Sequence, residues 1–442
     1  MTDALGADAA AEPSVRCTEA EAVDNLVAVL RLCQTGRLTC SATTRRPSAA
    51  TVRAVADVLV AGDFYPDDAM AAFAWPLLLQ AGGLARLEGN RLVLTPKGRA
   101  ALGRPAHEVI RAIWDRWPRH APIDELGRVE RIKGQKAAAA LSAAGPRRSA
   151  AAAALRHCPP GEWIGIDALF SVVRRREPMT VARSERALWK LYVADPEYGS
   201  LGYDGLHDWP ILEGRYLLAV LFEYAATLGL LDVEYLLPAG ARDDFSELYG
   251  ADWIDALSRY DGLQAVRLTP LGAYAAGLSE TYAPAEPAAP ARGLQVLPNL
   301  DVVALGDLAP ADRLVLDAFA DRASERVWTL SMAALLSAVD AGRSPRELAA
   351  FLDARAVHGV PAAVRTLVDD VEARAGRVRD LGLQRVVECA DAQLATLLMR
   401  DRAMEARCTR VGERHLLVDP ADEGKVRAAL LRLGHPLGPQ TR

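Results

Sequence analysis

The chain has 442 residues, 51% hydrophobic and 25% charged, a composition typical of a globular protein with about two to four domains. The formal net charge is −5 at pH 7, so basic charge is not a property of the whole chain. The longest apolar runs, such as Tyr216–Phe222, are far shorter than the roughly 20 residues that a membrane helix needs. The N-terminus also has neither the basic nor the apolar segment of a signal peptide. We therefore expect no membrane partner and a cytoplasmic location, either free or associated with the nucleoid.

The N-terminal part of the chain begins with an acidic, Ala-rich stretch, and we expect residues 1–17 to form a disordered tail. Apolar residues at helical spacing then predict a first helix within Glu19–Leu32. Ser48 is placed to cap a second helix over Ala49–Val60, and a third begins near Phe73 and ends at Gly82-Gly83. The following segment, Leu84–Leu94, is predicted to form a β-hairpin that turns at Gly89-Asn90.

One phrase occurs twice in the chain: Asn90–Leu102 read NRLVLTPKGRAAL and Ala265–Leu278 read AVRLTPLGAYAAGL. Thr95 and Thr269 can cap the helix that follows each apolar strand, and the proline after each suits the first helical position. Each copy follows a Leu-rich helical stretch that ends at a glycine. A helix-turn-helix, a short β-ribbon and a Thr-capped helix are typical of a winged helix, so the sequence predicts two winged-helix-like modules.

Two low-complexity segments predict the domain boundaries. Residues 131–154 form an Ala-rich basic linker, and residues 282–292 form a Pro/Ala linker. We therefore expect a winged-helix domain at 18–130, a second winged-helix-like domain at 155–281 and a C-terminal α/β domain at 293–442. The fold class is mainly α with small β, that is, α+β.

Charge separates these blocks. Arg128–Lys190 contain thirteen Lys and Arg against five Asp and Glu, whereas the stretch from Leu191 to Tyr282 is strongly acidic. Such a basic stretch can bind phosphates, because released counterions drive the affinity, or it can be a solvated arginine face. The acidic second ribbon is expected to contact a protein or the rest of this chain. The predicted DNA contacts are therefore basic or hydroxyl side chains of the first module and of the basic stretch: Arg45, Arg46, Thr51, Arg53, Arg86, Arg91, Lys97, Arg147, Arg148, Arg174, Arg175, Arg176, Arg183, Arg186 and Lys190.

The C-terminal block contains four recognisable phrases. In order they read QVLPNLDVVA, WTLS, AGRSPRELAAFL and VPAAVRTLVDDV, which predict one strand (through Leu294, Val296, Leu300 and Val302) and then short helices separated by glycines. Over residues 293–440 this order resembles the accessory region of XPB-like DNA-repair helicases and their bacterial relatives. The resemblance implies a bacterial helicase-associated protein whose C-terminal domain lies beside a helicase motor and contacts DNA or partner subunits.

The residues of a catalytic centre are missing from the sequence. No GxxxxGK[ST] phosphate loop occurs, and the nearest segment, Arg131–Lys136, lacks the first Gly and the Ser/Thr, so we expect no ATPase motor and no cofactor. Carboxylate pairs such as Asp232/Glu234 have no Lys at the spacing of a nuclease site, and the histidines and six cysteines form no metal-ligand pattern. The tryptophans and tyrosines (Trp114, Trp117, Trp163, Trp189, Trp209, Trp253, Tyr216 and Tyr224) are expected to be mainly core residues and not base-stacking platforms.

The sequence therefore favours a non-enzymatic DNA-binding accessory protein of a helicase or DNA-processing system, which binds duplex or forked DNA with little sequence preference. The first alternative is an adaptor that recruits or regulates a separately encoded helicase or nuclease through the acidic second module and the C-terminal domain. A sequence-specific transcription regulator is a lesser alternative, because no dimer helix is evident.

Overall fold

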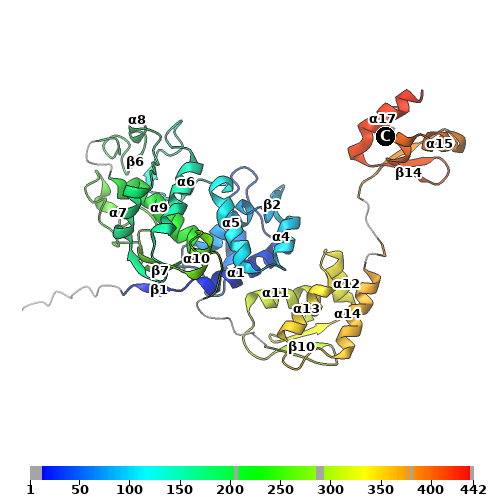
Figure 1. Ribbon diagram of the computed structural model, residues 1–442, viewed down its shortest axis with the longest axis horizontal. Helices are drawn as coiled ribbons and strands as arrows, with labels where there is room; N and C mark the ends of the chain where they lie inside the picture. Colours follow the sequence, from blue (N-terminus) through cyan, green and yellow to red (C-terminus); the bar gives the residue numbers. More distant parts are fainter. Residues whose placement is uncertain (1–11, 204–207, 285–292, 376, 379–381, 439–442) are drawn as a thin grey trace, which may run out of the picture. The chain divides into compact units, whose positions relative to one another are not determined.

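The computed structural model describes residues 12–203, 208–284, 293–375, 377–378 and 382–438. Their contacts form two compact units, residues 1–368 and residues 369–442, and each unit is described by itself (Figure 1). The described residues combine many helices with small antiparallel sheets, which confirms the α+β class. Residues 1–11 of the predicted disordered tail and residues 285–292 of the predicted Pro/Ala linker lie outside the described residues. The predicted tail is wrong over Ser14–Arg16, which form a strand paired with Val233–Tyr235.

The first repeat consists of three helices, a hairpin and a short closing helix. Its elements are β1 (Ser14–Arg16), α1 (Glu19–Gln34), α2 (Ala49–Ala56), α3 (Ala71–Ala81), β2 (Ala85–Glu88), β3 (Arg91–Leu94) and α4 (Pro96–Ala101). Ser48 caps α2 as predicted, because its Oγ accepts a hydrogen bond from the Thr51 N–H at 3.2 Å. The segment before α2 runs along β3, since the Leu92 N–H donates to the Leu38 carbonyl at 2.9 Å and the Cys40 N–H donates to the Asn90 carbonyl at 2.8 Å. A three-stranded ribbon results.

The second repeat has the same order of elements with longer connections. After α5 (Ala106–His120), η1 (Glu125–Arg128) and β4 (Ile132–Lys133), its elements are α6 (Ala144–Ala153), η2 (Ala154–His157), β5 (Trp163–Gly165), α7 (Ile166–Arg176), α8 (Glu185–Leu188), β6 (Tyr192–Val193), η3 (Pro210–Gly214), α9 (Arg215–Ala219), η4 (Val220–Ala225), β7 (Leu231–Tyr235), η5 (Ala251–Trp253), β8 (Leu263–Leu268) and α10 (Pro270–Ala275). The segments η3, α9 and η4 follow one another as a single helical run, 210–225. The hairpin β7–β8 belongs to a four-stranded antiparallel sheet of order β1-β7-β8-β5.

The two Leu-Thr-Pro phrases close their repeats with the same hydrogen bonds. Thr95 and Thr269 each accept a bond from the N–H three residues later, at 3.1 and 2.8 Å, which confirms both predicted caps. Each hydroxyl also donates to the carbonyl of the glycine that ends the preceding helix, Gly83 at 2.8 Å and Gly229 at 2.7 Å. These two glycines have φ of +70° and +73°, the left-handed region that glycine adopts without strain.

The glycine after each Leu-Thr-Pro phrase is required by a close backbone approach. A Cβ built on Gly98 would lie 2.0 Å from the carbonyl oxygen of Leu84, and one on Gly272 would lie 2.0 Å from that of Leu230. The two copies therefore share the contacts that hold the closing helix against the hairpin as well as the sequence phrase.

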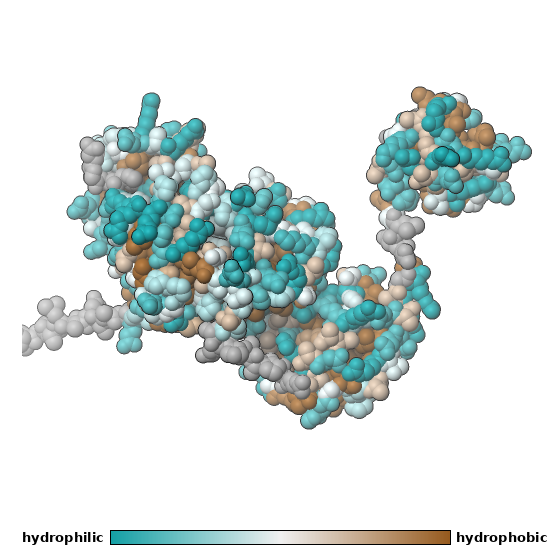
Figure 2. Space-filling model, in the orientation of Figure 1, coloured by the Kyte–Doolittle hydropathy of each residue, from teal (hydrophilic) through white to brown (hydrophobic). Residues whose placement is uncertain are grey.

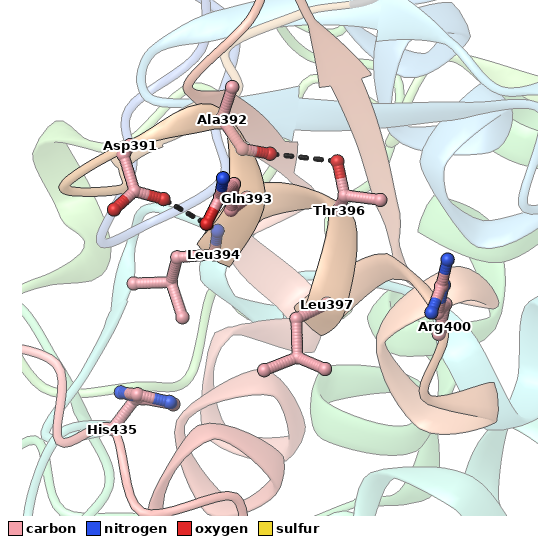
Figure 3. Close-up of a pocket in the computed structure, with 8 residues that line it drawn as sticks. All are labelled: Asp391, Ala392, Gln393, Leu394, Thr396, Leu397, Arg400 and His435. Atoms are coloured by element: carbon pink, nitrogen blue, oxygen red, sulfur yellow. Dashed lines mark hydrogen bonds between the residues drawn. The ribbon is translucent and has the colours of Figure 1, made fainter.

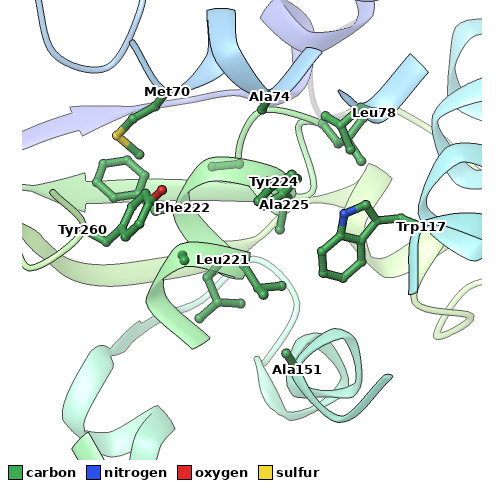
Figure 4. Close-up of a cluster of buried hydrophobic side chains, with 14 of the residues drawn as sticks. Met70, Ala74, Leu78, Trp117, Ala151, Leu221, Phe222, Tyr224, Ala225 and Tyr260 are labelled. Atoms are coloured by element: carbon green, nitrogen blue, oxygen red, sulfur yellow. The ribbon is translucent and has the colours of Figure 1, made fainter. Parts of the chain in front are cut away.

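Both repeats share one hydrophobic core, which runs from Ala22 to Ala275. Figure 4 shows its centre, where Met70, Ala74 and Leu78 around α3 face Phe222 and other side chains of the helical run 210–225. Residues 131–154, predicted as a linker, include helix α6, which packs on α5. The two blocks predicted as separate domains are thus parts of one folded body, because the apolar face of each repeat is covered by the other.

The next block of unit 1 is a small α/β layer. It contains β9 (Leu294–Val296), β10 (Asp301–Ala304), α11 (Pro310–Phe319), β11 (Ala320–Arg322), β12 (Val327–Leu330), α12 (Met332–Asp340), α13 (Pro345–Arg355) and α14 (Ala362–Arg374), whose sheet has the order β11-β12-β10-β9. The single strand predicted here is a hairpin, because the chain turns at Leu300, whose φ is +73°. The three predicted short helices are present as α12, α13 and α14.

Unit 2 is a three-stranded antiparallel sheet covered by helices on one face. Its elements are β13 (Arg385–Glu388), α15 (Ala392–Met399), α16 (Arg402–Glu405), β14 (Cys408–Val411), β15 (His415–Val418), η6 (Pro420–Asp422) and α17 (Glu423–Arg432), with strand order β13-β15-β14. Val387, Leu416 and Val418 point into the core with the helices. The other face carries two neighbouring cross-strand rows. One row contains Val386 and Leu417, and the next contains His415 and Val411.

Two further expectations can be compared with the described residues. No helix among them is long and apolar enough to cross a membrane. The predicted C-terminal domain, 293–442, is divided between the two units after Val368.

Candidate nucleic-acid interface

The helix that precedes each hairpin is buried, although this is the position from which a helix-turn-helix protein reads DNA. In α3 every residue except Gln80 is buried, including Phe73, Trp75 and Leu78. The helical run 210–225 is buried from Ile211 onward. A helix reads base edges only when its side chains can enter the major groove. Neither helix can do so while the two pack against each other.

The ribbon of the first repeat is exposed and strongly basic. Between Thr35 and Ala56 the sequence contains four arginines and no carboxylate. Five exposed arginines of this region were predicted as contacts, and Arg37 joins them. The six are named the basic ribbon: Arg37, Arg45, Arg46, Arg53, Arg86 and Arg91. Arg37 was missed because its segment does not read as a strand on its own; the Thr39–Arg91 bridge brings it beside β3.

The turn before α2 presents two of these arginines to solvent. The Arg45 N–H donates to the Ser41 carbonyl at 2.8 Å, and Arg45 adopts a φ of +63°. The guanidinium of Arg46 makes one bond of 3.3 Å to the Gly127 carbonyl and remains exposed. Arg86 forms an ion pair of 2.5 Å with Glu88, and both side chains are more than half exposed. The basic ribbon thus holds an excess of positive charge that water now solvates.

Two predicted contacts of the first repeat have a structural role in this arrangement. Thr51 is buried; its hydroxyl donates to the Thr39 carbonyl at 2.8 Å and accepts from the Thr39 N–H at 2.7 Å, which fastens α2 to the ribbon. The Lys97 ammonium donates to the Gly82 carbonyl at 3.1 Å. Partial burial, followed by the positive charges of Arg116 and Arg104, lowers the pKa of Lys97.

Arg147 and Arg148 do not belong to a surface patch. Both are buried on α6, where Arg147 pairs with Asp124 and Arg148 donates to both carboxylate oxygens of Glu125 at 2.9 Å. The same carboxylate accepts the Tyr216 hydroxyl at 3.0 Å. Burial raises the pKa of Glu125, against the attraction of Arg148. The predicted phosphate contacts at these two positions are wrong for the folded chain, because internal carboxylates already occupy both guanidinium groups.

The remaining predicted cations are exposed and form two groups. Arg174, Arg175 and Arg176 occupy the last turn of α7, where the helix dipole favours positive charge, and Arg174 lies 3.3 Å from Asp208. Arg183, Arg186 and Lys190 surround α8 instead, and Figure 1 shows α7 and α8 at different places in the second repeat.

The acidic hairpin of the second repeat faces its own chain. Asp232 on β7 accepts from the Thr18 N–H at 2.8 Å and from Arg267 at 2.7 Å, and β1 pairs along β7. Asp244 binds Arg215, an ion pair that lowers the pKa of the carboxyl although burial opposes the shift. Within the described ranges, no group of three or more His, Cys, Asp and Glu side chains could hold a metal ion.

The structure divides the aromatic residues that were expected in the core. Trp114, Trp117, Tyr216 and Tyr224 are buried as expected. Trp163 is 37% exposed, Trp189 is 52% exposed and Trp253 is 90% exposed, so the expectation is wrong for these three. Sequence periodicity could not separate them, because Trp189 follows the four-residue helix α8 and Trp253 ends the three-residue η5, and elements so short have no periodic apolar face.

A shallow depression of about 790 Å³ lies on unit 2 (Figure 3). Leu394, Leu397 and His435 border it. Its polar groups serve helix α15, since Asp391 accepts from the Leu394 N–H at 2.7 Å and Thr396 donates to the Ala392 carbonyl at 2.7 Å.

Comparison with known proteins connects the C-terminal part of the chain to helicases. Residues 294–411 match the family model described as "Helicase conserved C-terminal domain", a segment that extends from β9 to the end of β14. The match supports a helicase-associated protein and a helicase-related role in nucleic-acid processing. No curated protein matches the chain.

Proposed function

We propose that this chain is a non-catalytic nucleic-acid-binding accessory protein of a helicase or another DNA-processing system. The basic ribbon contacts phosphates, and binding depends little on base sequence. The observation that carries the proposal is the pairing of an exposed basic ribbon with two buried reading helices. Contacts to phosphates fix a protein on nucleic acid, whereas only contacts to base edges read sequence directly.

The two repeats are, in this proposal, winged-helix units that pack through their reading helices. The order of three helices, hairpin and Thr-capped helix supports this assignment, as does a strand before the second helix of each unit, Leu38–Cys40 in the first and β5 in the second. The hairpin β2–β3 is then the wing of the first unit. A wing that tracks the backbone can bind duplex or forked DNA without a helix in the groove.

The chain has no motor of its own in this proposal and works beside a separately encoded helicase. The family match at 294–411 and the XPB-like phrases in the same segment support an association with a helicase. The missing phosphate loop supports the proposal that a separate protein supplies the motor. Purified protein should hydrolyse no ATP, with or without DNA; DNA-stimulated hydrolysis that survives further purification would contradict this part.

The direct test is a fluorescence-anisotropy titration with duplex and forked DNA at two salt concentrations. Replacement of Arg45, Arg46 and Arg91 by Ala should weaken duplex binding and reduce the slope of log K against log salt by about 0.9 for each lost phosphate contact. A matched control removes the same charge from unit 2, by replacement of the exposed Arg400, Arg402 and Arg414. Wild-type protein that does not bind DNA at about 50 mM salt, or equal losses in both variants, would contradict the proposal.

An adaptor is the second candidate, and one surface favours it. On the face of the unit 2 sheet opposite its helices, Val386 of β13 is 59% exposed and Val411 of β14 is 46% exposed. Leu417 lies on β15, the strand between these two. This face lies largely within the helicase-related match, so a helicase motor is its proposed partner. Val386→Asp should abolish co-purification of the motor from the native host while DNA binding is retained; retained co-purification would contradict the adaptor.

A further inference from the structure

The second repeat has an insertion between α7 and the helical run 210–225 that forms a partly buried hairpin, Trp189–Tyr203. The Leu201 N–H donates to the Leu191 carbonyl at 2.8 Å, and the Val193 N–H donates to the Gly199 carbonyl at 3.0 Å. The hairpin turns at Asp195, whose carboxylate accepts the N–H groups of Glu197 and Tyr198. Strand β4 pairs with β6 on its other side, so the hairpin is anchored to unit 1.

An aromatic pair stands at the open end of this hairpin. Trp189 and Tyr203 lie with ring centroids 4.8 Å apart in an edge-to-face arrangement. Gly202 lies directly against the indole, because a Cβ there would be 2.4 Å from a ring atom. Trp189 remains 52% exposed although Gly202 and Tyr203 both contact its ring. An indole that is held in place by such contacts and half exposed can serve as a stacking platform for a flat ring.

Basic residues precede Trp189 in the sequence, whereas the turn of the hairpin carries Asp195 and Glu197. Arg183, Arg186 and Lys190 are exposed, and Glu185 is the only carboxylate from Pro178 to Ala194. Lys133 joins them from β4, where it lies opposite Tyr192 of β6. The Lys190 ammonium donates to the Ala138 carbonyl at 2.6 Å, which orients the group and leaves its charge intact. Aromatic faces interleaved with cations are complementary to unpaired bases on a phosphate backbone.

We propose that the Trp189–Tyr203 hairpin binds single-stranded nucleic acid, with an unpaired base stacked on Trp189 and phosphates at Arg186 and Lys190. This inference rests on the proposed function and refines it, because it gives the chain a surface for the strand that a helicase separates. A duplex cannot occupy the platform in the same way, since its base faces are stacked inside the helix.

The chain offers a matched control at Trp253. This side chain is 90% exposed, yet its neighbours in the sequence include Asp252 and Asp255, both exposed. Carboxylates repel a phosphate backbone, so Trp253 should bind no strand even though it is the more accessible indole. Trp189→Ala and Trp253→Ala therefore remove the same ring from a segment with basic sequence neighbours and from a segment with acidic ones.

The experiment titrates full-length protein with an oligothymidylate of about 16 nucleotides and, separately, with a duplex. Wild-type tryptophan fluorescence should be quenched by the oligothymidylate. Trp189→Ala should weaken single-strand binding by about 10-fold and abolish most of the quenching, whereas Trp189→Phe should restore most of the affinity. Trp253→Ala should change neither, and duplex affinity should be the same in all four proteins.

A second measurement keeps the test independent of the folding of Trp189→Ala. Arg186→Gln and Lys190→Gln should each reduce the slope of log K against log salt for the single strand by about 0.7. Unchanged single-strand affinity in Trp189→Ala, or an equal loss of affinity in Trp253→Ala, overturns the inference. Neither result contradicts the proposed binding of duplex DNA by the basic ribbon. Wild-type protein that binds neither oligothymidylate nor duplex overturns both proposals together.

Discussion

The two repeats close in the same way but use their hairpins differently. Both end in a Thr-capped helix held against a left-handed glycine, with hydrogen-bond lengths that agree within 0.3 Å. The first hairpin, β2–β3, forms a small basic ribbon at the surface, whereas β7–β8 lies inside a four-stranded sheet and ties its carboxylates to Thr18 and Arg267. A shared local motif therefore determines the fold of each repeat, and the neighbouring strands determine which hairpin can meet a partner.

The two repeats also share the burial of the helix that precedes each hairpin. Each repeat covers the helix of the other, so the pair gains a large core and loses two surfaces that could read bases (Figure 4). The exposed face of the molecule in Figure 2 is mixed, with hydrophilic residues between smaller apolar areas. If the proposed function is correct, exposed charge on the ribbons and connections makes the contacts with nucleic acid.

The largest effect should come from the buried ion pairs that join the repeats. Arg128 donates to both oxygens of Glu223, at 3.1 and 3.0 Å, and Glu223 is fully buried. Arg128→Met should lower the free energy of unfolding by about 3–5 kcal/mol, because it leaves a buried carboxylate with only the Tyr260 hydroxyl. The eight tryptophans all lie in unit 1, so denaturation followed by tryptophan fluorescence measures this unit.

The control is the exposed pair of the first hairpin. Arg86→Met removes the partner of Glu88. Because both side chains are well solvated, the free energy of unfolding should change by about 1 kcal/mol or less. Equal effects at Arg128 and Arg86 would show that the interior of the two-repeat body is more hydrated than its burial implies.

The closing glycines should give the next largest effect, and they test whether the repeats are equivalent. Gly98→Ala and Gly272→Ala each place a Cβ about 2.0 Å from a backbone oxygen, so each should destabilise unit 1 by about 3 kcal/mol. Gly103→Ala is the control, because its nearest atom is 3.8 Å away. A clear difference between Gly98 and Gly272 in thermal unfolding would mean that one repeat relaxes and the other cannot.

How much of this could be predicted from the sequence depends on the range of the interactions. The caps at Ser48, Thr95 and Thr269 follow from residues within three positions, and all three were predicted correctly. The closure of each repeat could also be anticipated from the repeated phrase. These features depend on local hydrogen bonds, which the sequence order already brings together.

The site was harder to predict because charge alone does not report burial. Arg148 resembles Arg175 in the sequence, yet Glu125, 23 residues earlier, draws Arg148 into the core. Arg37 was overlooked because it joins the basic ribbon only through pairing with a strand about 50 residues later. Trp189 could not be separated from Trp117, since exposure depends on an insertion that has no counterpart of similar length in the first repeat.

A smaller effect should separate the roles of the two hairpins. Arg91→Met in the first hairpin should weaken duplex binding by about 3-fold at low salt and leave the free energy of unfolding unchanged. Arg267→Met in the second should cost about 1 kcal/mol of stability, because it breaks the 2.7 Å pair with Asp232, and should leave binding unchanged. The two readouts are anisotropy and chemical denaturation. A binding defect in Arg267→Met would contradict the assignment of the second hairpin to the interior.

The smallest effect concerns the thiols, which show whether the repeats open together. Cys33 near the end of α1 and Cys158 after η2 occupy similar places in the two repeats, and burial raises the pKa of each thiol to about 12. Because a higher pKa means less thiolate, both should react very slowly with Ellman's reagent at pH 8, whereas the exposed Cys17 should react at once. Cys17→Ser should remove this rapid reaction with Ellman's reagent and leave only the slow reaction of the buried thiols.

If the repeats form one cooperative body, Cys33 and Cys158 should be labelled in parallel as denaturant is added, as peptide mapping would show. Earlier labelling of Cys33 would mean that the first repeat opens alone, and that the buried helix α3 can become accessible to a partner.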